Sequence, residues 1–485
     1  MKAIKYILMG ALVFGAIPAM AQEDNQAIIK QAEKIIASKS ADVASQMKDI
    51  YKANKKNPEV LVGIGQAYLN VKDTVNATLY ADYALKRDSK YAKAWILKGD
   101  IAVMEDDGGL AATNYQNAMY YDPKEPEGYY KYALVMRGVS PETAVETLEK
   151  LRENRPDYPV DQLSGRIYYN AGKFEQAVES YSKVADVKSM NDEDITYYAI
   201  SEWLLGNREK SIEICKQGLS KDPRRAAWNR VAFYNYTDLK DVNNALAYAD
   251  KLFHQSDSAH FTGEDYTYYG TALKLANRNG EAMEAFKNAI DFNKDNRKQL
   301  DILNKHISDL YLAEEDYDNA ISYLRKTFEE KPSMDDFENL ASIYTDIAAK
   351  KTQAAEKETD AAAKSAAAAD AAAAFKEADK IYGEMQAAYP NYENYCNYMR
   401  GQINANLDPD SKQGLAKPFY EALADALSKK AELNTSEKAM LKQAYTYLIV
   451  YAYNVKQDKA GAKEWAAKLL QVDPENEIAK QVQAL

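Results

Sequence analysis

The sequence has few of the residues on which catalysis, metal binding and cross-linking depend. Its 485 residues include 2 cysteines and 3 histidines, and they contain no HExxH, Walker, GxSxG or CxxC motif. Cys215 and Cys396 stand far apart in amphipathic stretches, so we expect two buried, unpaired thiols rather than a disulfide. We therefore predict no enzymatic activity, no metal site and no cofactor.

Glycine, proline and long hydrophobic runs are also scarce. The 20 glycines and 13 prolines are fewer than an average chain of this length carries, which predicts short connections between helices. Beyond the N-terminus, no apolar run approaches the roughly 20 residues that a membrane-spanning helix needs. The net charge of −11 disfavours nucleic acid and anionic lipid as partners.

The first residues have the pattern of a secretory signal peptide. Lys2 and Lys5 precede an apolar stretch over residues 6–17, and the small-residue site Ala19-Met20-Ala21 follows. Because the apolar stretch is too short to span a bilayer, we predict export and cleavage after Ala21, with a retained N-terminal anchor as the alternative. No cysteine lies at the cleavage site, as a lipoprotein leader would require. We expect the mature chain in the periplasm or cell envelope of a Gram-negative bacterium.

What the sequence does contain is a repeat. Between residues 94 and 123, large and small residues alternate at fixed offsets and a proline closes the unit. The positions are Trp95, Gly99, Ala102, Ala111, Tyr115, Ala118 and Pro123. The small residues allow two helices to approach closely, and the large ones fill the space between helix pairs.

The small residue that opens the second helix of each unit recurs along the chain. The series is Ala77, Ala111, Ala144, Ala177, Ser211, Ala245, Ala282, Ala320, Ala378, Ala416 and Ala462, and its first spacings are 34, 33, 33, 34 and 34 residues. An aromatic residue follows four positions later in several units, namely Tyr115, Tyr181, Phe286, Tyr382 and Tyr420. This recurrence is too regular to arise by chance.

These residues make the chain resemble the tetratricopeptide repeat family over nearly all of its length. The resemblance implies an all-α fold, an open right-handed superhelical solenoid of antiparallel helix pairs, with about 11–12 repeats. Such a solenoid has one continuous elongated core rather than separate globular domains.

The repeat pattern divides the chain into six segments. They are a signal peptide (1–21), an N-terminal helix pair (22–58), a regular array (59–334), a repeat with a long insertion (335–392), divergent units (393–474) and a capping helix (475–485). The insertion, 349–374, is rich in alanine and charged residues, which are strong helix formers. We expect a projecting helical hairpin there, serving either as a contact arm or as a tolerated extension.

The resemblance also implies where a partner would bind, because the first helices of such repeats line a concave groove for protein segments. Carrying the groove positions over gives Tyr129, Arg137, Arg166, Tyr169, Trp203, Arg230 and Tyr234. Aromatic residues and arginines are common anchors in protein recognition, and arginine pairs with carboxylates. The family's carboxylate clamp for chaperone tails is not matched. The alternative is that the arginines balance nearby acids and the aromatics are packing residues.

The function implied is an exported scaffold that mediates protein–protein interaction, with an envelope glycan-binding protein as the alternative. The oligomeric state is left open by the sequence. Asp73-Thr74-Val75 and Asp257-Ser258-Ala259 resemble acceptor sites for bacterial O-glycosylation at Thr74 and Ser258, and we expect both in loops.

Overall fold

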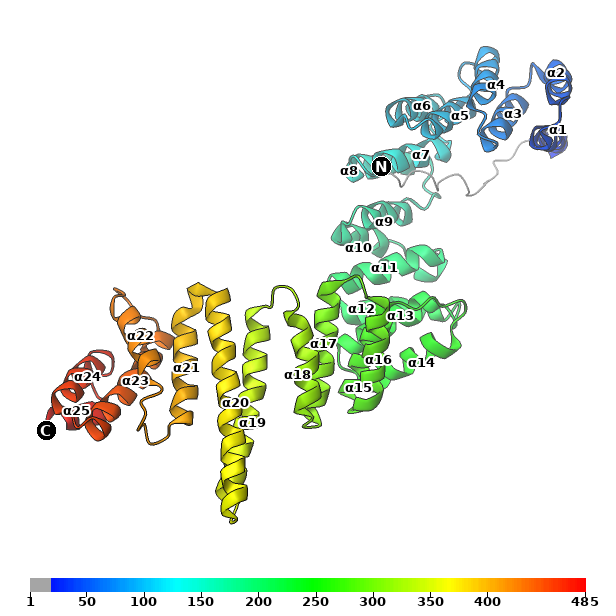
Figure 1. The fold of residues 1–485 in the computed structure, drawn as a ribbon. Helices are drawn as coiled ribbons and strands as arrows, with labels where there is room; N and C mark the ends of the chain where they lie inside the picture. The colour runs from blue at the N-terminus through cyan, green and yellow to red at the C-terminus, as the bar shows by residue number, and fades with distance from the viewer. Residues whose placement is uncertain (1–18) are drawn as a thin grey trace. The chain divides into compact units, whose positions relative to one another are not determined.

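The computed structural model describes residues 19–485, with side chains from Asp24 onward. Within this range the regular structure is helical and no strand forms, which confirms the expected all-α class. The chain divides into two compact units, Met1–His260 and Phe261–Leu485 (Figure 1). The predicted signal peptide falls mostly outside the described residues. Helix α1 begins at Ala19 and runs through the expected cleavage point, so cleavage stays a prediction.

The first unit consists of seven consecutive helix pairs in its described part. Its helices are α1 (Ala19–Ser38), α2 (Val43–Asn54), α3 (Pro58–Asn70), α4 (Thr74–Arg87), α5 (Ala92–Met104), α6 (Gly108–Tyr121), α7 (Pro126–Met136), α8 (Pro141–Asn154), α9 (Val160–Asn170), α10 (Phe174–Ser182), α11 (Asp192–Leu204), α12 (Arg208–Leu219), α13 (Ala226–Asp238) and α14 (Val242–Asp250). A π-helical turn, Lys251–Gln255, continues α14.

The second unit consists of five further pairs and a short final helix. Its helices are α15 (Gly263–Leu275), α16 (Asn279–Phe292), α17 (Arg297–Ala313), α18 (Tyr317–Arg325), α19 (Met334–Lys357), α20 (Ala361–Ala388), α21 (Glu393–Leu407), α22 (Lys417–Ser428), α23 (Thr435–Val450), α24 (Lys459–Val472) and α25 (Glu477–Gln483). The last helix packs on α24 and α23. The twelve pairs agree with the expected 11–12 repeats.

One turn recurs between the two helices of a pair. In the pair α3–α4, Lys72 adopts a positive φ of 65° and Asp73 then caps α4 by accepting a hydrogen bond from the Asn76 amide. The same combination of a left-handed residue and an aspartate cap occurs at Asp106–Asp107, Lys240–Asp241, Glu315–Asp316 and Gln457–Asp458. Because the carboxylate satisfies an amide that the helix leaves unpaired, a very short connection suffices.

The predicted series of small residues forms the centre of the core. All eleven members, from Ala77 to Ala462, have no exposed surface, and the five aromatic residues that follow them are buried. Gly165, a small residue of the first helix α9, shows how closely the two helices of a pair approach. A Cβ atom there would lie 2.7 Å from ring carbons of Tyr181, so the ring of α10 packs directly on the backbone of α9.

The alanine-rich insertion forms a helical hairpin, as predicted. Helices α19 and α20 pack against each other and extend beyond the other helices of the second unit (Figure 1). The first helix ends at Lys357, and the Asp360 side chain caps the second by accepting from the Ala363 amide. No helix among the described residues combines the length and the apolar character needed to cross a membrane.

Candidate binding face on the first helices

The predicted groove residues lie in or at the ends of the first helices of four consecutive pairs in the first unit. Helix α11 contacts both α9 and α13, so three first helices lie side by side. We call the surface of α9, α11 and α13 the first-helix face. Its middle helix, α11, carries the side chains that decide its chemistry.

Arg166 of α9 is bound to a buried acid. Its Nε lies 2.9 Å from Asp194 Oδ1 and its Nη2 lies 2.6 Å from Asp194 Oδ2. Asp194 of α11 is fully buried and also accepts from the Tyr181 hydroxyl at 3.1 Å and from the Gln162 amide. These hydrogen bonds to the carboxylate raise the pKa of Arg166. The guanidinium therefore joins two repeats by neutralising a charge that has no contact with water.

This pairing favours the second interpretation of Arg166 offered by the sequence. The Nε–Nη2 edge of Arg166 already holds a buried carboxylate, and its charge is compensated there, so it is less suited to pair with an acidic ligand as well. Burial, with the charge of Asp194, also raises the pKa of Tyr181, so its hydroxyl stays a donor to Asp194. We therefore regard Arg166 as a structural residue of the junction.

The aromatic residues of the face form two groups. Tyr169 of α9 stacks on Tyr197 of α11, with ring centroids 4.1 Å apart, and contacts Phe174 edge-on. Trp203, at the other end of α11, donates from Nε1 to Asp238 at 3.1 Å and lies 5.8 Å from the ring of Tyr234. Both groups join α11 to a neighbouring first helix. Tyr169, Tyr197 and Trp203 are half-buried, which leaves part of each ring in solvent.

The remaining predicted residues are not brought into one groove. Tyr129 and Tyr234 are each 6% exposed and serve as packing residues. Arg230 donates to the His260 carbonyl at 2.7 Å. The side chain of Arg137, at the C-terminal end of α7, makes no hydrogen bond or ion pair with another described residue. Of the three arginines, Arg137 alone keeps its donors available in the described part of the chain.

Sequence reasoning missed three residues of α11 that complete the exposed part of the face. They are Tyr197, Ile200 and Leu204. Because successive residues of a helix are about 100° apart around its axis, these three and Trp203 fall within one sector of about 120°. The opposite side of α11 is buried, whereas Leu204 is 49% exposed. Ile200 and Leu204 do not stand at signature positions of the repeat. They are recognised as part of the exposed face only because the other side of α11 is buried.

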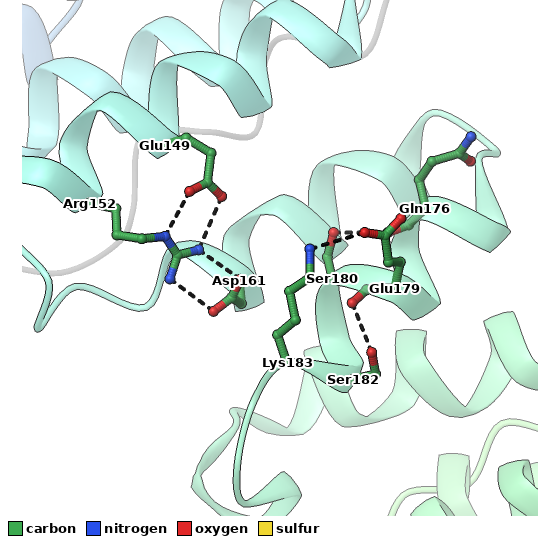
Figure 2. A network of polar contacts seen from close by, with 8 residues as sticks. All are labelled: Glu149, Arg152, Asp161, Gln176, Glu179, Ser180, Ser182 and Lys183. Atoms are coloured by element: carbon green, nitrogen blue, oxygen red, sulfur yellow. Dashed lines mark hydrogen bonds and ion pairs between the residues drawn. The ribbon is translucent and has the colours of Figure 1, made fainter.

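Ion pairs away from this face are of a different kind. Figure 2 shows Arg152 of α8 between Glu149 of the same helix and Asp161 of α9, with two hydrogen bonds to each carboxylate. All three side chains keep part of their surface in solvent. In the same view Lys183 pairs with Glu179 within one turn of α10. Water screens such pairs, so they contribute little to stability compared with a buried pair.

The two candidate glycosylation sites differ in their backbone. Ser258 is exposed in the loop after the π-helical turn, with φ of 50°. Thr74 is the first residue of α4 and half-buried, so the expectation that it lies in a loop is wrong. The reason is the cap at Asp73, whose side chain accepts from the Asn76 amide, so that α4 begins at Thr74.

The expectation of two buried free cysteines is confirmed. Cys215 and Cys396 are both unpaired and have no exposed surface. Desolvation by burial raises the pKa of both thiols, that of Cys396 to about 11, so neither has thiolate character near neutral pH. Among the described residues no group of histidine, cysteine and acidic side chains is arranged to hold a metal ion.

The repeat itself is recognised by comparison with known families. The family model of the tetratricopeptide repeat matches residues 162–189 and 306–333. The first match covers most of α9 and all of α10, and the second covers the end of α17 and all of α18, so each falls on one helix pair. The chain therefore contains tetratricopeptide repeats at these two places. No curated protein matches it.

Several solved structures are similar to this chain. One is the C-terminal part of a repeat-containing protein from Cytophaga hutchinsonii, which is 21% identical, covers 59% of this chain and 98% of its own, and has a TM-score of 0.45. Another is a tetratricopeptide repeat protein from Parabacteroides merdae, with 18% identity, coverage of 53% and 98%, and a TM-score of 0.34. PilF of Pseudomonas aeruginosa has 17% identity, coverage of 42% and 95%, and a TM-score of 0.34.

Proposed function

We propose that this protein is a non-enzymatic scaffold whose first-helix face binds a segment of another protein. The observation that carries the proposal is the row of half-exposed Tyr197, Ile200, Trp203 and Leu204 on α11. Tryptophan and tyrosine are the side chains most often found at the centre of protein interfaces. Their ring partners Tyr169 and Tyr234 hold them in place, so little side-chain entropy is lost on binding.

The partner that fits this row is a segment with apolar side chains. Arg166 adds little preference for acidic residues, because its charge is already paired with that of Asp194. Arg137 is the remaining candidate for contact with a partner carboxylate, and it lies two pairs away from α11. We therefore expect an affinity dominated by apolar contact, with a modest dependence on salt.

The test uses a charge placed in the exposed row. Leu204→Glu should abolish partner binding, and Val75→Glu serves as the matched control because Val75 is 79% exposed on α4, away from the face. A photo-crosslinking residue at position 204 should capture one or a few proteins in cells. Capture at position 75 as efficient as at 204, or full binding by Leu204→Glu, would contradict the proposal. Retention on polysaccharide without any protein capture would favour the glycan-binding alternative.

We also propose that the protein is exported. The support is the pattern of residues 1–21, two lysines, an apolar stretch and a small-residue site. N-terminal sequencing of the protein from isolated envelope fractions should find Gln22 as the first residue. A protein that begins at Met1, or that fractionates with the cytoplasm, would contradict export.

A further inference from the structure

A cavity of about 300 Å³ lies in the first unit, and no residue of α11 lines it. Its walls come from α12, α13, α14, the π-helical turn and the loop before α13, and the wall residues used below are Lys216, Arg224, Asn229, Tyr248 and Lys251. The volume is at the lower end of the range of small-molecule sites. A π-helical turn, as here after α14, often occurs where a helix carries a functional site.

Two lysines in the wall of this cavity form no ion pair with an acid of the described chain. The ammonium of Lys216 lies 5.6 Å from the ring centre of Tyr236, and that of Lys251 lies 4.2 Å from the ring centre of Tyr248. Arg224, by contrast, pairs with Asp257 at 2.5 Å. Two ammonium groups at one cavity, neither of them in an ion pair with an acid of the described chain, favour an anionic ligand.

A buried acceptor in the same wall lacks a donor. Asn229 has no exposed surface, and its Nδ2 donates to the Pro223 carbonyl at 3.1 Å and to the Ser256 hydroxyl at 3.2 Å. Because the carbonyl can only accept, this contact fixes which end of the amide is the nitrogen. The Oδ1 atom accepts no hydrogen bond. A buried acceptor without a partner is unfavourable, so a ligand that donates to it gains affinity.

We propose that the cavity binds a small carboxylic acid that carries a hydroxyl or an amide N–H beside its carboxylate. The carboxylate pairs with Lys216 and Lys251, and the neighbouring donor bonds to Asn229 Oδ1. Uronic-acid sugars and N-acylated amino acids share this chemistry. Leu204 does not line the cavity, so the two proposals can be tested independently of each other.

The test measures binding of defined probes to the full chain by calorimetry at low salt. Glucuronate supplies a carboxylate with hydroxyl donors, N-acetylglycine supplies a carboxylate with an N–H donor, acetate lacks the donor and glucose lacks the charge. At least one of the first two should bind at least tenfold more tightly than acetate and glucose. The one that binds more tightly shows which ligand class, uronic-acid sugars or N-acylated amino acids, the cavity prefers. No binding of either acid, or equal affinity for acetate, would overturn the proposal.

Variants locate the binding within the cavity. The double variant Lys216→Gln, Lys251→Gln should lose at least tenfold in affinity for the preferred acid. Lys210→Gln is the matched control, because Lys210 is an exposed lysine of the same helix that pairs with Glu213. The Asn229 side-chain amide resonances report on the site directly, and they should shift on addition of the acid. Undiminished binding by the double variant, or an unshifted Asn229 amide, would overturn the assignment. Leu204→Glu should leave this binding unchanged.

Discussion

The junction between α9 and α11 and the hairpin of α19 and α20 are stabilised in opposite ways. At the junction, a fully buried aspartate receives donors from Arg166, Gln162 and Tyr181, all from the preceding repeat. At the tip of the hairpin, nearly every residue from 356 to 370 is exposed, and Lys351 and Asp370 form a solvent-exposed ion pair at 3.2 Å. The junction depends on a neighbour's side chains, whereas the hairpin tip depends on local helix propensity.

The largest loss of stability should follow from removing Arg166, the charge partner of Asp194 at the junction. Arg166→Ala leaves Asp194 buried and unpaired, which should cost about 3–5 kcal/mol. Hydrogen exchange of the α9 and α11 amides measures this loss of stability locally. A local measurement is needed because the units of a repeat protein need not unfold together. We expect exchange in both helices to accelerate by two orders of magnitude or more.

Arg152→Ala is the matched control for that experiment. Arg152 likewise joins two helices, but it binds two partly exposed carboxylates and its own side chain is 37% exposed (Figure 2). Its removal should cost at most about 1 kcal/mol, because water solvates Glu149 and Asp161 once the guanidinium is gone. Equal effects of the two variants would show that burial does not distinguish the two ion pairs.

The next largest effect concerns close packing at the same junction. Gly165→Ala places a Cβ atom 2.7 Å from the Tyr181 ring, whose hydroxyl donates to Asp194, and should cost about 1–3 kcal/mol. Gly280→Ala is the control, because a Cβ at Gly280 of α16 meets no atom within 4 Å. The control should stabilise its helix by about 0.4–1 kcal/mol, since alanine restricts the unfolded chain. Thermal unfolding of both variants gives the sign of each change.

The junction and the hairpin also differ in how far the sequence predicts them. The small residues recur because a helix backbone must meet an aromatic ring at Gly165 and its equivalents, so spacing alone located the core. The hairpin was predictable too, since alanine favours a helix and Asp360 caps the second one. Helix propensity and the spacing of small residues are local properties, so both can be read from a single sequence.

The candidate binding face could be predicted only in part. The repeat register placed Tyr169 and Trp203 on first helices, and both are half-exposed there. It could not reveal that Arg166 meets Asp194, because the two lie 28 residues apart and no periodic signal links an arginine to its acid. Tyr129 matches the groove pattern in residue type and in position on its helix. Only three-dimensional packing shows that its side chain is buried.

A smaller effect should depend on pH in the second unit. His306 of α17 stacks on Phe286 at 4.9 Å, and desolvation, with the charge of Lys274 as a second cause, lowers its pKa. The unfolded chain then binds a proton more readily than the folded one, so stability is lost as pH falls below about 6.5. Unfolding midpoints at pH 7 and pH 5 should differ more for the native chain than for His306→Phe. The same pH dependence in both would contradict the assignment to His306.

The smallest effect should be confined to the hairpin. Ala368→Gly lies on an exposed part of α20 and should cost about 1 kcal/mol of local helix stability. Hydrogen exchange should accelerate near residue 368 and stay unchanged after Ala378, which is buried in the core. Acceleration beyond Ala378 would mean that the tip supports the rest of the unit. A purely local effect would mean that the tip can change its surface without changing the fold, as a contact arm for a partner would require.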